Sequence, residues 1–127
     1  MTWLSLILVF KIIVSFVFLI LPFLFLPKEK LEIMTSTQAD TSQLYRLYGV
    51  AVLALVVAYG FGISPAEAGV FPWGVVTMGI FSNMGASACM ISYGVSKKNR
   101  FPIILFGFIG LALTAAALAP ELALNKI

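Results

Sequence analysis

Few side chains in this 127-residue sequence are of a kind that does chemistry, and they stand apart from one another. Lys11 is the one formal charge well inside an apolar stretch, Asn83 is the most polar uncharged side chain in mid-stretch, and Arg46 opens another. Cys89 is the single cysteine, and the sequence contains no histidine. Nucleophilic catalysis by a Ser–His or Cys–His pair is therefore excluded, as is a histidine-ligated metal or haem site.

Lys11 is a candidate functional residue because an ionisable group inside a membrane segment is expensive. It follows Trp3 by eight residues, about 12 Å along a helix. The structural alternatives are snorkelling, in which the methylene stem carries the ammonium to the outer interface, and an ion pair with Glu67 or Glu121. We favour these alternatives over contact with a solute, and we expect Lys11→Met to leave folding and insertion nearly intact.

The other polar candidates also have structural interpretations. Asn83 is expected to hydrogen-bond across helices, although a polar cavity for a ligand or a headgroup is the functional alternative. Arg46 is interpreted as an interfacial anchor that binds lipid phosphate, with recognition of an anionic ligand as the alternative. Cys89 is interpreted as a buried, inert packing residue. The candidate partners of Asn83 are Thr77, Ser82, Ser87 and Thr114.

The composition places all of these residues in a membrane protein. Apolar residues make up 61% of the sequence and charged residues 10%, whereas soluble domains average about 45–50% and about 25%. A helix needs about 20 apolar residues to cross the hydrocarbon core. The sequence predicts an all-α integral membrane protein, a single domain over 1–127 that forms a four-transmembrane-helix bundle with short loops and no cofactor. The predicted spans are 3–26, 44–63, 73–95 and 101–119.

Several local signals mark the ends of these spans. Pro22 lies inside the first span and is expected to kink it, because it leaves a carbonyl without its usual partner. Asp40 and Gln43 fit a capping box for the second helix. Residues 64–67 are expected to form a separate short turn in a tight loop. The polar segment 28–39 fits either a short interfacial helix or a plain loop.

Basic residues predict how the chain is threaded. Six of the eight lie between spans one and two or between spans three and four, two connections that share a side of the membrane. The positive-inside rule places both connections in the cytoplasm and both termini outside, in an inner or plasma membrane. The six are Lys28, Lys30, Arg46, Lys97, Lys98 and Arg100. Aromatic belts are expected with Trp3, Tyr59 and Trp73 outside and with Tyr45, Tyr48 and Tyr93 inside.

Small residues predict the contact faces between helices, because lipid provides no hydrophobic drive for helix association. The first span lacks them and is predicted to be the most lipid-exposed. The alternative to lipid contact is that the phenyl rings of this span form a docking surface for another membrane subunit. These rings belong to Phe10, Phe16, Phe18, Phe23 and Phe25. The predicted small-residue stripes are Ala51, Ala54, Ala58 and Gly62; Ser82, Gly85 or Ala86, Cys89 and Ser92; and Gly107, Gly110, Thr114 and Ala117.

The layout resembles the DoxX-like group of small four-helix membrane proteins. The resemblance rests on a first span that ends in prolines (Pro22, Pro27), a short polar connection, and a second span that opens with Arg46 and then Gly49. It covers most of the chain by architecture. Some members of that group are subunits of sulfur or quinone redox complexes, so the resemblance implies an accessory subunit rather than an activity. The external N-terminus predicted here is not matched to that group.

These observations leave three functional hypotheses. The first is a non-catalytic accessory, assembly or stabilising subunit of a larger membrane complex, with the lipid bilayer and other membrane subunits as partners. The alternative is a small transporter or channel that self-associates, with Lys11 or Asn83 touching the solute. The third is a DoxX-like quinone-linked subunit. Nucleic-acid binding is not expected, because no clustered basic stripe on a soluble module is present.

Overall fold

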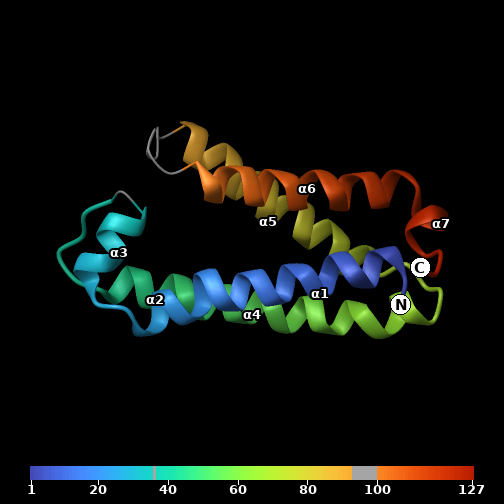
Figure 1. Ribbon diagram of the computed structural model, residues 1–127, viewed down its shortest axis with the longest axis horizontal. Coiled ribbons are helices and arrows are strands. Elements are labelled where there is room, and N and C mark those ends of the chain that lie inside the picture. The colour runs from blue at the N-terminus through green and yellow to red at the C-terminus, as the bar shows by residue number, and fades with distance from the viewer. Residues whose placement is uncertain (36, 93–99) are drawn as a thin grey trace.

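Helices make up the fold of this protein. The computed structural model describes residues 1–35, 37–92 and 100–127, and within those ranges it contains helices and no strands (Figure 1). Four helical stretches are long and apolar enough to cross a membrane: Trp3–Phe25, Gln43–Glu67, Trp73–Ser92 and Phe101–Leu118. The predicted all-α, four-helix membrane fold is confirmed. The elements are α1 (Trp3–Ser15), η1 (Phe16–Ile20), α2 (Leu21–Phe25), α3 (Lys28–Thr35), α4 (Gln43–Glu67), α5 (Trp73–Ser92), α6 (Phe101–Leu118) and α7 (Pro120–Ala123).

The first span is continuous through its proline because the helix widens just before it. In η1 the backbone amide of Leu21 donates to the carbonyl of Phe16, five residues earlier. This π-helical register places Pro22 in the first turn of α2, where its missing N–H matters least. The proline thus changes the hydrogen-bond register upstream of itself while the span continues to Phe25.

Two predicted helix boundaries are wrong. Residues 64–67 continue α4 as its last turn, with Pro65 inside the helix, and the helix gives way at Gly69, whose φ is +79°. The predicted Asp40–Gln43 capping box is absent, since Ser42 stands at the cap without a side-chain bond and the Gln43 amide donates to Thr41 Oγ1 at 3.3 Å. The end of the third predicted span, 93–95, lies outside the described residues.

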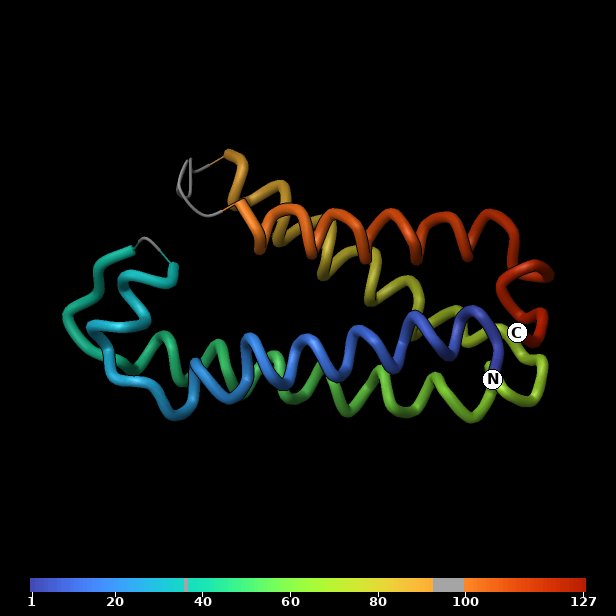
Figure 2. The backbone as a smooth tube through the Cα atoms, viewed as in Figure 1, coloured from blue at the N-terminus to red at the C-terminus, as the bar shows by residue number. Residues whose placement is uncertain are grey.

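The four spans form two antiparallel pairs. The stretch from α1 to α2 packs along α4, and α5 packs along α6. The pairs touch each other through α1 with α6 and through α4 with α5. Figure 2 shows that the pairs converge toward the end that holds both termini and lie apart at the end that holds α3.

The first span is the most buried of the four, so its predicted exposure to lipid is wrong. One third of its most apolar window (33%) is buried, against 22–28% for the other spans. The buried residues recur at helical spacing and include Leu4, Leu8, Lys11 and Ser15. Large side chains make this contact because α1 packs against both α4 and α6. Small residues are therefore not required for a central position in this bundle.

A polar cluster, the terminal clasp, fastens three segments at one end of the bundle. The Trp3 amide donates to the carbonyl of Asn125 at 3.2 Å, and Thr2 forms a backbone bridge with Lys126. Glu67, the last residue of α4, accepts hydrogen bonds from the Thr2 amide at 3.1 Å and from the Ser5 hydroxyl. The clasp therefore joins the start of α1, the end of α4 and the residues after α7.

The polar segment after the first span forms a short helix, α3. Leu31 is fully buried there against Phe23 and Tyr45. This contact folds α3 over the ends of α2 and α4, and the helical alternative for this segment is the correct one (Figure 1).

Candidate functional site

Lys11 lies inside the bundle and not at its edge. Its side chain is 5% exposed, and its ammonium sits 4.7 Å from the centre of the Phe106 ring on α6. Within the described part of the chain, no carboxylate lies within ion-pair distance of Lys11, and it makes no hydrogen bond through its side chain. Snorkelling and the ion pair with Glu67 or Glu121 are therefore both wrong. Phe106 supplies a nearby electron-rich ring face that attracts the cation, and Glu67 is occupied in the terminal clasp.

A cavity of about 110 Å³ adjoins the Lys11 side chain between the two helix pairs. All four spans contribute to its wall. Lys11 is the one charged lining residue, four others carry hydroxyls, and the remainder are apolar. The lining residues are Lys11, Ser15, Leu19, Tyr48, Val52, Leu55, Val56, Tyr59, Ser82, Ala86 and Phe106.

Ser15 supplies an unused hydroxyl to this cavity. It follows Lys11 by one helical turn, so the two side chains share a face of the first span. A serine inside a helix commonly donates to the carbonyl four residues earlier. Ser15 does not: it is 1% exposed, and its hydroxyl has no hydrogen-bond partner among the described residues. The cavity wall therefore contains an ammonium and a hydroxyl, and neither forms a hydrogen bond with another described residue.

Asn83 bonds across helices as predicted, but to an unexpected residue. Its Nδ2 donates to Tyr59 Oη on α4 at 3.0 Å and to the carbonyl of Gly79 at 2.7 Å. Tyr59 was predicted at the outer aromatic belt and is instead fully buried in the core. The Asn83 Oδ1 atom is buried and has no hydrogen-bond partner in the part of the chain that the structure describes. The bond holds Tyr59 against the cavity from the α5 side.

The predicted small-residue stripes are mostly misplaced. The buried face of α4 is formed by Tyr45, Gly49, Val52, Tyr59, Gly62 and Ala66, so only Gly62 of the predicted stripe belongs to it. The buried face of α5 is formed by Val76, Gly79, Asn83 and Ser87. Cys89 is exposed and not buried, and Gly110 on α6 is buried as predicted. Tyr45, Tyr59 and Asn83 therefore lie on contact faces that the small-residue pattern predicts to consist of alanine and serine.

Arg46 binds the backbone of the first span. Its Nη1 donates to the carbonyl of Phe23 at 2.7 Å, and this bond ties α2 to the start of α4. Phe23 is buried, so it does not belong to an exposed phenyl face, whereas Phe10, Phe16 and Phe18 are exposed. Phe18 also meets the Phe101 ring edge-on, with 5.8 Å between centroids.

Arg46→Ala is expected to lower the free energy of unfolding by about 1.5–3 kcal/mol, the usual contribution of a hydrogen bond to a charged group. The measurement is reversible unfolding in mixed detergent micelles. Lys30→Ala, which removes an exposed basic residue from the adjoining α3, is the matched control. Equal stability of Arg46→Ala and the control would show that Arg46 serves the lipid interface alone.

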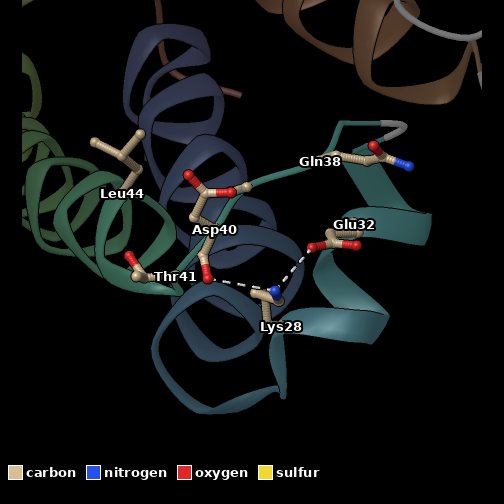
Figure 3. A pocket seen from close by; sticks show the side chains of 7 residues that line it. Lys28, Glu32, Gln38, Asp40, Thr41 and Leu44 are labelled. Carbon is tan, nitrogen blue, oxygen red and sulfur yellow. Dashed lines mark hydrogen bonds and ion pairs between the residues drawn. The ribbon is translucent and has the colours of Figure 1, made fainter.

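A second pocket lies at the α3 end of the molecule. It is open, about 840 Å³ in volume, and is lined by Lys28, Glu32, Gln38, Ala39, Asp40, Thr41 and Leu44. Figure 3 shows the Lys28 ammonium between the Glu32 carboxylate and the carbonyl of Asp40, each at 3.5 Å. The lysine is already bonded inside this pocket, whose walls carry both signs of charge and are open to solvent, so the cavity beside Lys11 remains the candidate site.

Comparison with known protein families, with curated proteins and with solved structures gave no significant match. The DoxX-like resemblance accordingly stays a prediction from the sequence. The candidate site is defined by its own geometry: Lys11, Ser15 and the cavity between the helix pairs.

Proposed function

We propose that this protein binds a small polar solute inside its helix bundle and acts as a small transporter or channel. The observation that supports this proposal is the buried Lys11 ammonium, which adjoins a cavity of about 110 Å³ and has no charged partner in the described chain. A charge in that position is expensive and is characteristic of solute and ion pathways.

An accessory subunit would not need this arrangement. A purely structural first span would be more stable with an apolar residue at position 11, because burying a charge without a partner is unfavourable. The exposed rings of Phe10, Phe16 and Phe18 are compatible with a partner subunit, yet lipid tails satisfy them equally well. The geometry therefore favours the solute-binding hypothesis over the accessory-subunit hypothesis.

The cavity limits the size of the bound group. A cavity of about 150 Å³ holds one benzene molecule, so about 110 Å³ admits a group of only a few heavy atoms. The solute is therefore a small molecule or the small polar end of a larger one.

The proposed orientation follows the basic residues. We place the α3 end of the bundle in the cytoplasm and the terminal clasp outside an inner or plasma membrane, in accordance with the positive-inside rule. Lys28 and Lys30 belong to α3 and Arg46 to the first turn of α4, whereas the exposed Trp3 and Trp73 open α1 and α5. Lys97, Lys98 and Tyr93, which belong to the same prediction, fall outside the described residues.

Solute flux into liposomes that contain only this protein tests the proposal. Shrinkage and re-swelling after osmotic shock, followed by light scattering with neutral, anionic and cationic small solutes, should show uptake of at least one class above protein-free liposomes. Lys11→Met should reduce that uptake about tenfold, equivalent to about 1.4 kcal/mol. Ile13→Met, an exposed position on the same helix, should not. Absence of uptake for every solute, together with isolation of the protein only in a hetero-complex, would return the accessory-subunit hypothesis to first place.

A further inference from the structure

We infer that the solute is a small monovalent anion, held by the Lys11 ammonium and the Ser15 hydroxyl. This inference rests on the proposed function and names the class of ligand. It follows from the charge, the free hydrogen-bond donors and the size of the cavity.

The charge of the cavity is positive and uncompensated. The sequence has five acidic residues, and each lies in α3, in α7, in a loop or at the last residue of α4. None of them lines the cavity, whose single charged residue is Lys11. The ring face of Phe106 attracts the cation without neutralising it. A bound anion would supply the missing charge in a low-dielectric setting, where the attraction is strongest.

Two donors without a hydrogen-bond partner among the described residues line the cavity, the Lys11 ammonium and the Ser15 hydroxyl. Phe106 covers one side of the ammonium, and the negative face of its ring repels an anion. Ser15, one turn farther along α1, offers an unbonded hydroxyl as a donor. An ammonium has three donor hydrogens and no acceptor. We therefore place the anion in the cavity away from the Phe106 ring, where Lys11 and Ser15 can both donate to it.

The walls select for low charge and small size. Leu19, Val52, Leu55 and Val56 are apolar, and the one ammonium balances one negative charge. A divalent anion would bring a second negative charge into a cavity that holds one cation and otherwise only hydroxyl and apolar groups, which is unfavourable. A volume of about 110 Å³ fits chloride, nitrate or formate and excludes a sugar acid such as gluconate.

Thermal unfolding of the purified full chain in a non-ionic detergent tests the inference. Sodium chloride, nitrate and formate are compared with gluconate and sulfate at constant ionic strength, with tryptophan fluorescence as the signal. A ligand that binds only the folded state raises Tm in a saturable manner. The wild-type protein should show a saturable rise with the small monovalent anions, whereas gluconate and sulfate should give at most the non-saturable rise of an excluded salt.

Variants separate a built site from a general salt effect. Lys11→Met should abolish the anion-dependent rise in Tm, Ser15→Ala should weaken the apparent affinity several-fold, and Ile13→Met should behave as the wild type. If Lys11→Met does not fold, Lys11→Gln is the second variant that removes the charge.

An equal saturable rise in Tm in the variants without the charge, or in gluconate, overturns the inference. Uptake of a neutral solute with no anion-dependent shift would reject the anion and leave the proposed function standing, whereas neither uptake nor shift would reject both.

Discussion

Gly79→Leu is expected to lower the free energy of unfolding by about 3 kcal/mol, at the upper end of the usual effect of overpacking. Gly79 lies on α5 where three spans meet. A Cβ at this position would stand 2.6 Å from Leu113 Cδ1 on α6, and 3.0 Å from Cε1 and 3.1 Å from Oη of Tyr59 on α4. A leucine side chain would therefore push α5 away from both neighbours. It would also displace Tyr59 from the cavity wall.

Gly85→Leu is the matched control for this prediction. Gly85 lies on the same helix, and nothing lies within 4 Å of where its Cβ would be. The two substitutions make the same gain in helix propensity and the same gain in apolar surface. Unfolding in mixed micelles should thus show a loss for Gly79→Leu alone. Similar stabilities for the two variants would mean that α5 does not approach α4 and α6 as closely as the structure shows.

Lys11→Met is expected to raise the free energy of unfolding by about 1–4 kcal/mol in a buffer free of small anions, the range observed when buried ionic groups are replaced by apolar ones. Methionine keeps the length of the stem while it removes an ammonium that has no carboxylate partner among the described residues and that contacts the Phe106 ring. This prediction is stronger than the sequence-based expectation that the substitution leaves folding nearly unchanged.

The advantage of Lys11→Met should depend on salt. Chloride or nitrate should raise the free energy of unfolding of the wild type and so reduce its difference from the variant, because a bound anion compensates the buried charge. Equilibrium unfolding with and without nitrate measures both effects, with Ile13→Met as the reference. A variant that is less stable than the wild type in anion-free buffer would show that the contacts of the ammonium, such as that with the Phe106 ring, outweigh the cost of burying its charge.

The number, type and approximate limits of the spans could be predicted because hydropathy and span length are properties of contiguous residues. The predicted limits were wrong at both ends of α4, where the adjoining turns determine how far the helix extends. It continues through Pro65 to Glu67, and Ser42 rather than Asp40 stands at its start. The capping rule considers a few residues, whereas the packing of α3 against Tyr45 decides how the chain approaches α4.

Only part of the candidate site could be predicted from the sequence. Lys11 and Asn83 stand out by type, yet their surroundings depend on which helices pair. Tyrosine is a residue type typical of the membrane interface, and Tyr59 fits into the core only because Gly79 leaves room for it. Ser15 carries no signal of its own, because a serine in a membrane helix normally satisfies itself against the preceding turn. The spacing of Lys11 and Ser15 by four residues was the one available hint.

The terminal clasp bears on how this chain is made. During synthesis the first span leaves the ribosome long before residues 125–127, to which its opening turn is bonded. Co-translational insertion can therefore bring α1 into the bilayer and beside α4 first, and the opening turn of α1 is fixed only after residues 125–127 have been made. The backbone bonds between the opening turn of α1 and residues 125–127 are therefore among the last contacts of the bundle to form.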